Sequence, residues 1–309
     1  MSYLVFIVAV GAFALLGAGG PIHRDSWFEP ITRRVDAIEL DLWPSLALRV
    51  AAPLIGVGLV LWVLSGLVGG LADALVGTAL LYFAWGRGDY PTDLEKFLAR
   101  GRVGDVEGAE MLLGETARSH SGESLAVRAL RDLTYRGFAR WFPPVFYFWL
   151  LGPFAAAAYR LTELSNTRAE GRFDAALKLL DWLPSRLLLL SFAVLGDFER
   201  TRTVLTSDAF DQSVANDVLL ATGVERAGSL DLESAEDVGG GEAAVSAVEA
   251  MQKALTRAMA LWIALASVVA SSVLASAIQA VIAAPPDQQV VPAAARERIL
   301  PVSAVHDVI

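Results

Sequence analysis

Residues 141–159 read WFPPVFYFWLLGPFAAAAY and residues 183–196 read LPSRLLLLSFAVLG, and both apolar stretches contain prolines. Arg160 follows the first stretch, Arg186 lies near the start of the second, and Asp197 follows it. Charged side chains so close to long apolar runs are costly in lipid, and they usually line a site. The sequence therefore predicts a site in this part of the chain.

The composition indicates a membrane protein. Of the 309 residues, 55% are hydrophobic, and the mean hydropathy of +0.49 exceeds that of an ordinary soluble chain. Residues 2–22, 141–159 and 258–284 carry no charge, and residues 50–86 contain only Asp73. Because about 20 apolar residues cross a bilayer, residues 50–86 are long enough for two helices. We predict an all-α, polytopic inner-membrane protein with four or five spans.

The distribution of basic residues predicts the orientation of the paired spans, which we place at residues 46–64 and 67–85. Residues 65–72 between them carry no Lys or Arg, so this turn is expected on the periplasmic side. The segments 23–49 and 87–140 carry many basic residues and are expected in the cytoplasm. No Lys or Arg precedes the first apolar stretch, which favours a retained span over a signal peptide.

The topology of residues 141–198 stays open at this stage. Strict alternation places residues 160–182 outside, yet they carry four basic groups. Broken or re-entrant helices are the alternative, and these occur where protein or a water-filled cavity surrounds the backbone. Pro184 fits a first helical turn.

We divide the chain into six regions. They are N-terminal membrane spans (1–86), a cytoplasmic helical insert (87–140), a core with proline-broken helices (141–198), an acidic cytoplasmic segment (199–257), a C-terminal span (258–284) and a flexible tail (285–309).

Two segments show an amphipathic helical pattern. The first runs from about Glu123 into Trp141, with arginines opposite its apolar face, and this basic face is either solvated or an anion or partner surface. The second covers residues 173–182 and is expected to lie on the membrane surface. Its apolar side is Phe173, Leu177 and Leu180, and its polar side is Asp174, Lys178 and Asp181.

Several kinds of chemistry find no support in the sequence. The chain has no cysteine and three histidines far apart, which excludes a tight His/Cys metal site. No GxxxxGK[ST] motif is present, and the net charge of −9 argues against nucleic acid as a partner. We therefore predict no catalytic residue, no metal and no cofactor, and we favour a non-enzymatic protein.

The candidate ligand-binding residues surround the two apolar stretches, and three roles are open for their arginines. Arg160 and Arg186 either anchor the chain at the interface, or pair with acids to hold two broken helices together, or bind an anionic ligand. The candidates are Arg160, Arg186, Tyr159, Glu163, Asp181, Asp197 and Arg136.

Two blocks of the chain resemble the AmpE family, inner-membrane proteins related to the CobD/CbiB synthases of cobalamin biosynthesis. The blocks are residues 138–161, FARWFPPVFYFWLLGPFAAAAYRL, and residues 181–198, DWLPSRLLLLSFAVLGDF. Their shared pattern is Phe-Trp, Gly-Pro and Tyr-Arg, followed by Trp-Leu-Pro-x-Arg-Leu and Gly-Asp-Phe. The resemblance is good over roughly residues 80–200.

The resemblance implies a sensor or modulator that accompanies induction of a chromosomal β-lactamase and is linked to cell-wall recycling. The related synthases carry a helix rich in Glu, Asn and Asp before the first block, whereas this chain has Arg131, Tyr135 and Arg136 there. An ATP-dependent ligase needs acids to hold Mg²⁺, so their loss argues against synthase activity.

Our prediction is therefore an AmpE-like modulator of the β-lactam response. The alternatives are a CobD/CbiB-like amide-forming synthase and a small-anion transporter. The expected partners are the lipid bilayer and an anionic small molecule or cell-wall fragment, with a homo-oligomer as an open alternative.

Overall fold

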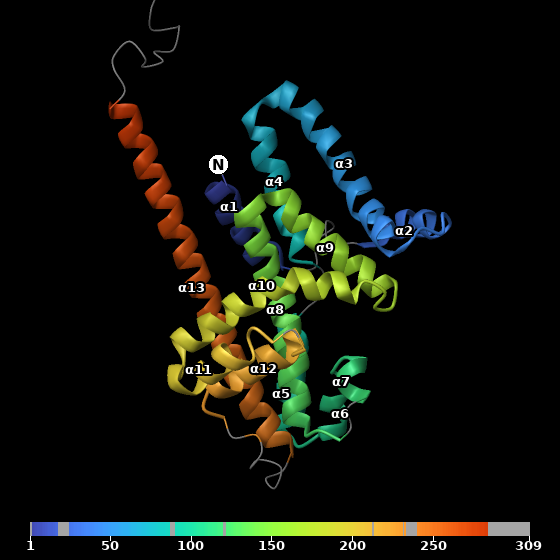
Figure 1. Cartoon of the computed structure of the whole chain (residues 1–309), viewed down its shortest axis with the longest axis vertical. Helices are drawn as coiled ribbons and strands as arrows, with labels where there is room; N and C mark the ends of the chain where they lie inside the picture. Colours follow the sequence, from blue (N-terminus) through green and yellow to red (C-terminus); the bar gives the residue numbers. More distant parts are fainter. Residues whose placement is uncertain are drawn as a thin grey trace, which may run out of the picture. The chain divides into compact units, whose positions relative to one another are not determined.

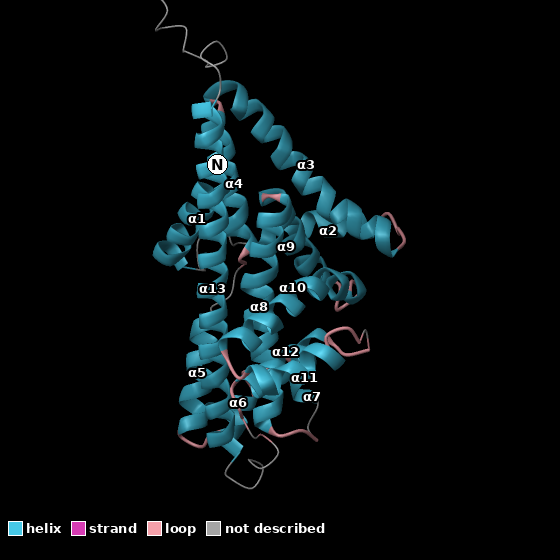
Figure 2. Cartoon of the chain, turned by 60° about the vertical axis from the view of Figure 1, so that its left-hand side comes forward, coloured by secondary structure: helices cyan, strands magenta, loops and turns pink. Residues whose placement is uncertain are grey.

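The computed structural model describes residues 2–17, 25–86, 90–119, 122–211, 213–230, 232 and 240–283, and every regular element in this part is a helix (Figures 1 and 2). The all-α prediction is thus confirmed. The three histidines and the predicted flexible tail lie outside the described residues.

The helices follow one another in chain order. They are α1 (Ser2–Leu16), the 3-10 helix η3 (Asp25–Phe28), α2 (Glu29–Asp36), α3 (Leu42–Val68), α4 (Gly70–Ala84), α5 (Tyr90–Arg102), α6 (Val106–Glu110), α7 (Glu115–Ser119), α8 (Leu125–Leu151), α9 (Pro153–Arg168), α10 (Asp174–Leu195), α11 (Phe198–Ser207), α12 (Asn216–Ala227) and α13 (Gly240–Ala283).

The chain divides into two compact units, Met1–Ala264 and Leu265–Ile309. The first contains all the helices up to the middle of α13. The described part of the second is the apolar C-terminal part of α13, which covers most of the predicted C-terminal span.

Among the described helices, α3 alone is both long and apolar enough to cross a membrane. It leaves large side chains exposed, including Ile55 (61%), Leu59 (60%) and Trp62 (74%). Helices α1 and α4 are also apolar, but each has only 15 residues. The expected four or five spans therefore stay a prediction.

The predicted pair of helices is present, and its turn lies at Gly69. This residue has φ +60°, a conformation that side chains with a Cβ rarely adopt, so α3 ends there and α4 begins at Gly70. Helix α4 in turn packs against α1, α3 and α9.

The prolines do not break the helices, which corrects the sequence prediction. Helix α8 continues through Pro143 and Pro144, and α10 continues through Pro184, which is therefore not in a first turn. All three prolines are buried in packed surroundings. Tertiary packing here outweighs the roughly 3 kcal/mol by which an interior proline disfavours a helix.

The break comes instead at Gly152, between α8 and α9. Its backbone has φ 90° and ψ −177°, a region open almost only to glycine, and Pro153 then starts α9 at the first position, where a missing N–H is harmless. The long apolar stretch at 141–159 thus contains the end of α8, a turn at Gly152 and the beginning of α9.

Replacing Gly152 with alanine is expected to lower the free energy of unfolding by about 1–3 kcal/mol, because alanine strains this backbone conformation. Thermal unfolding of the purified protein measures the effect. The matched control is Gly56→Ala inside α3, where no atom lies within 4 Å of the added Cβ. This control should be neutral or slightly stabilising, and equal behaviour of the two variants would contradict the prediction.

Helix α8 connects the two main groups of buried side chains in the first unit. Its N-terminal half packs with α5, α12 and the beginning of α13 through residues such as Leu130, Leu133 and Phe138. Its C-terminal half packs on α1 and α4, where Phe148 lies 6.1 Å from Phe6 between ring centroids. Helix α10 runs across α8 rather than along it (Figure 1), so several helices meet near the middle of α8.

Candidate functional site

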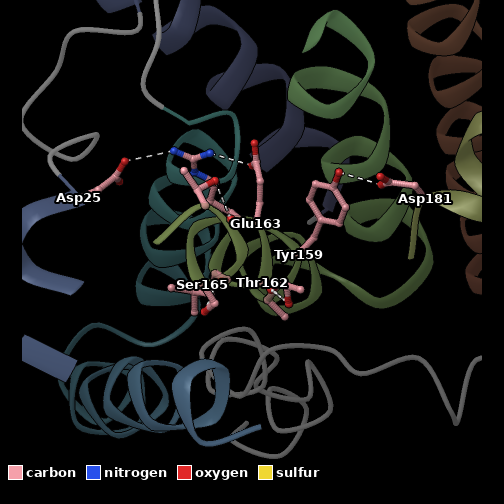
Figure 3. A network of polar contacts seen from close by, with 10 residues as sticks. Asp25, Tyr159, Thr162, Glu163, Ser165 and Asp181 are labelled. Atoms are coloured by element: carbon pink, nitrogen blue, oxygen red, sulfur yellow. Dashed lines mark hydrogen bonds and ion pairs between the residues drawn. The ribbon is translucent and has the colours of Figure 1, made fainter. Parts of the chain in front are cut away.

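A buried carboxylate lies where α8, α9 and α10 meet. Asp181 on α10 is fully buried, and it accepts hydrogen bonds from the hydroxyl of Tyr135 on α8 at 2.5 Å and of Tyr159 on α9 at 2.8 Å. Figure 3 shows the second of these contacts. Asp181 was predicted on the polar side of an amphipathic surface helix. It is buried instead, and the two tyrosines supply the donors that its burial requires.

The environment of Asp181 changes its acidity. Burial disfavours the charged form and raises the pKa of the carboxyl to about 6, although the two tyrosine hydroxyls favour the charged form and act in the opposite direction. Asp181 precedes the apolar stretch 183–196 and lies outside the candidate span of α3. The group therefore changes protonation within the physiological pH range.

Tyr159 is held on its other side by aromatic packing. Its ring stacks on Tyr147 of α8 with centroids 5.9 Å apart, and the Tyr147 hydroxyl donates to the backbone carbonyl of Leu180 at 2.8 Å. Asp181 and its donors are thus positioned by three helices.

Arg160, the neighbour of Tyr159, forms a second polar cluster. Its guanidinium contacts Glu163 at 2.7 Å and Asp25 at 3.1 Å, and the residue is 8% exposed. The two acids lie on opposite sides of the group (Figure 3). A Cβ at Gly86 would lie 2.7 Å from the Arg160 guanidinium carbon, so a larger residue there would displace the arginine side chain. Arg160 therefore connects η3 to α9 by ion pairs.

Pairing with an acid was one of the three roles left open for Arg186. It contacts neither Glu163, Asp181 nor Asp197. Its Nε donates to the carbonyl of Ala209 at 2.8 Å, and its Nη1 donates to Ser185 at 2.9 Å and to the side-chain oxygen of Asn216. The residue is 9% exposed. Arg186 thus connects α10 to Ala209, in the loop before α12, and to Asn216, the first residue of α12.

Asp197 and Arg136 lie apart from the Asp181 cluster. Asp197 caps α11 by accepting from the backbone N–H of Arg200 at 3.1 Å. Arg136 pairs with Asp132 at 2.7 Å and donates to the carbonyl of Leu112 at 3.1 Å. Of the seven candidates, the structure brings together Tyr159, Arg160, Glu163 and Asp181. Tyr135 was missed, because its partner is 46 residues away in the sequence.

A cleft of about 720 Å³ opens between α8, α9, α10 and α12, and we call it the central cleft. Tyr135, Tyr159 and Glu163 line it, so it lies directly over the buried Asp181. Its charged lining residues are Arg131, Lys178, Asp132, Glu163, Asp174 and Asp217. This volume is typical of a small-molecule site.

Most of these charges are already engaged within the protein. Arg131 pairs with Glu123 at 2.9 Å, and the carboxylates of Asp132 and Glu163 pair with arginines. Asn166 donates to Asp174 at 2.7 Å. The lining is therefore polar and of mixed sign. Within the described residues, no three His, Cys, Asp or Glu side chains are grouped in a way that could hold a metal ion.

The family model described as "Regulatory signalling modulator protein AmpE" matches residues 1–273. The chain belongs to the AmpE family. No curated protein and no solved structure matches it.

The AmpE match extends well beyond the two blocks in which the resemblance was first seen. It includes the helices that line the central cleft, which are α7, α8, α9, α10 and α12, as well as the apolar helices α1, α3 and α4. As a member of the AmpE family, the chain is a regulatory signalling modulator, and the central cleft lies within the part that defines the family.

Proposed function

We propose that this AmpE family protein is a multi-pass inner-membrane sensor that modulates the β-lactam response, with effects on β-lactamase induction and cell-wall recycling. The observation that carries the proposal is the central cleft over Asp181 at the junction of α8, α9, α10 and α12. A signal molecule bound there would contact four helices at once. Its binding would therefore favour one arrangement of these helices over another.

The apolar helices support the membrane placement. A helix of 15 residues is about 22 Å long, shorter than the roughly 30 Å hydrocarbon layer. However, α1 and α4 pack on each other, and α4 also packs on α3. A short span of this kind is accommodated by local thinning of the bilayer. The bundle of α1, α3 and α4 is therefore proposed to cross the membrane together.

The ligand we propose is an anionic small molecule or a cell-wall fragment. Lys178 and Arg131 are the two basic side chains that line the cleft, and Tyr135 and Tyr159 offer aromatic surface. Because acids also line it, a ligand with amide and hydroxyl groups beside its negative charge fits better than a simple anion.

The ion pairs in the cleft favour a sensor over a synthase. Asp132 and Glu163 line the cleft and have the carboxylates that Mg²⁺ needs, yet each contacts an arginine at 2.7 Å. Using them for a metal would require both ion pairs to break. The arrangement instead gives a preformed pocket in which Asp132 and Glu163 are already engaged by arginines.

Filling the cleft tests the proposal without removing any polar contact. Ala175 lines the cleft on the first turn of α10, so Ala175→Phe should block a ligand sterically. We expect cells that carry this variant in place of the native gene to show β-lactamase induction like that of a deletion strain. Induction is measured after exposure to several β-lactams.

Ala99→Phe on the exposed side of α5 is the matched control and should behave like the native protein. The level of each variant in the membrane must be the same. Unchanged induction in the deletion strain would overturn the role in the β-lactam response, whereas unchanged induction in Ala175→Phe alone would overturn the role of the cleft.

A further inference from the structure

Asp181 and its two tyrosines share a small number of protons. Each tyrosine hydroxyl has one, and both are directed at the same buried carboxylate. Tyr135 donates to one carboxylate oxygen at 2.5 Å, and Tyr159 donates to the other at 2.8 Å. An ionised carboxylate only accepts hydrogen bonds, whereas a protonated carboxyl group also has a proton to donate. The two protonation states of Asp181 therefore require different orientations of the tyrosine O–H groups.

The two tyrosines differ in how firmly they are held. Both line the central cleft, but Tyr159 is 2% exposed, whereas Tyr135 is partly exposed. The ring of Tyr159 stacks on Tyr147, whose hydroxyl donates to the carbonyl of Leu180. That carbonyl has no helical donor of its own, because Pro184, four residues later, lacks an N–H. Tyr159 is therefore fixed by its packing, and the hydroxyl of Tyr135 is the one that can turn toward a ligand.

Protonation of Asp181 changes what the cleft offers to a ligand. The protonated carboxyl oxygen donates to the Tyr135 oxygen, and the O–H of Tyr135 turns to an acceptor in the cleft. Tyr159 continues to donate to the other carboxyl oxygen. One proton is taken from solvent, and one negative charge beside the cleft disappears. Both changes favour a ligand that brings a carboxylate, because its oxygen accepts from Tyr135 and is no longer repelled by Asp181.

The other titratable groups around Asp181 come from every helix that borders the cleft above it. Those that interact with Asp181 or Tyr135 are Tyr147 on α8, Tyr159 and Glu163 on α9, and Asp217 on α12. The lining adds Arg131 and Asp132 on α8, and Asp174 and Lys178 on α10. Burial raises the pKa of Asp181 to about 6, the tyrosine hydroxyls lower it, and the charge of Glu163 raises it. Asp181 therefore exchanges its proton at a pH where ordinary carboxylates of a ligand stay ionised.

We propose that the central cleft binds a carboxylate-bearing ligand together with one proton, which Asp181 takes up so that the hydroxyl of Tyr135 donates to the ligand. This inference rests on the proposed binding of a signal molecule in the cleft, and it adds the contacting group of that molecule and the regulation of its affinity. Because the coupling between two bound species is reciprocal, the ligand stabilises the proton on Asp181 and acid strengthens ligand binding. Occupancy of the cleft then depends on pH as well as on the concentration of the ligand.

The coupling is tested with the full-length protein in neutral detergent and with N-acetylmuramyl-L-alanyl-D-glutamate as the probe. Isothermal titration calorimetry in buffers with different ionisation enthalpies measures both the affinity and the number of protons taken up. We expect the dissociation constant to rise about 10-fold from pH 5 to pH 7, because a carboxyl with a pKa of about 6 is mostly ionised at pH 7. At pH 7, binding of each probe molecule should take up about one proton.

Two variants separate the proton from the hydrogen bond. In Asp181→Asn the amide has a donor and an acceptor for the two tyrosines, as the protonated acid does. This variant should bind the probe at pH 7 as tightly as the native protein does at pH 5, without proton uptake. Tyr135→Phe keeps the ring but loses the donor, so it should bind the probe at pH 5 about 10-fold more weakly than the native protein. Asp93→Asn on α5, outside the cleft lining, is the control with the same charge change and should behave like the native protein.

The outcomes distinguish this proposal from the function on which it rests. Binding of the probe without proton uptake, a pH dependence that Asp181→Asn retains, or undiminished binding by Tyr135→Phe would each overturn the coupling and leave the cleft as a ligand site. Absence of binding by the native protein and by Asp181→Asn at every pH would overturn the ligand class of the cleft, and the coupling with it. Since Asp181→Asn removes a buried charge and is expected to gain stability, a folding defect does not account for changes in its binding.

Discussion

Replacing Arg160 with alanine is expected to lower the free energy of unfolding by about 3 kcal/mol. The change leaves Asp25 and Glu163 without their shared cation in a place where the arginine is 8% exposed. Removing one partner of a buried ion pair costs more than the pair itself contributes, because the remaining charge is not solvated. Chemical denaturation or thermal unfolding in detergent measures the loss.

The control for this prediction is Arg33→Ala, whose side chain is 72% exposed and forms one ion pair with Glu29 at 3.4 Å. It should change stability by less than about 0.5 kcal/mol. Adding Glu163→Gln to Arg160→Ala should restore part of the stability, since it removes one unpaired charge. A loss below about 1 kcal/mol for Arg160→Ala would show that the cluster is solvated and that Arg160 is free for a ligand.

The stability of the protein should carry a pH dependence that comes from Asp181. Its pKa is raised from 3.8 to about 6, so between these values the folded state binds more protons at this group than the unfolded state does. Stability from this group therefore falls as pH rises from about 4 to 6, and it stays lower above pH 6. Asp181→Asn removes this dependence, so the variant should gain about 2–3 kcal/mol relative to the native protein between pH 4 and 7.

The measurement is denaturant unfolding of both proteins at several pH values. Asp211→Asn is a control of opposite sign, because hydrogen bonds from Ser213 hold the pKa of Asp211 below its usual value. Relative to the native protein, this variant should lose stability as pH rises, by a small amount since the group is exposed. A flat difference for Asp181→Asn would mean that the carboxylate is ionised throughout.

The sequence predicted the helical class, a helix pair with its turn within residues 65–72, and the family. It also selected Tyr159, Arg160 and Glu163, which lie within one helix and are neighbours for that reason. These features depend on composition and local spacing, which a single sequence contains.

The partners of these residues depend on distant contacts that local patterns do not contain. Asp25 meets Arg160 across 135 positions, and Tyr135 meets Asp181 across 46. Pairing with an acid was one of three roles left open for Arg186. Its Nε donates instead to the carbonyl of Ala209, and a backbone carbonyl gives no signal in the sequence. Prolines were taken to end helices because their intrinsic preference is strong, whereas packing on both sides of α8 decides the outcome.

The two prolines inside α8 have a mechanical consequence. Proline has no N–H, so the carbonyls of Ala139 and Arg140 lack the amide donors that a regular helix would place four residues later. Ala139 lines the central cleft. The bending stiffness of α8 is therefore lowest at the level where a ligand would bind, between the half that packs with α12 and the half that packs with α1 and α4. A ligand in the cleft would therefore act on α8 where the helix resists bending least.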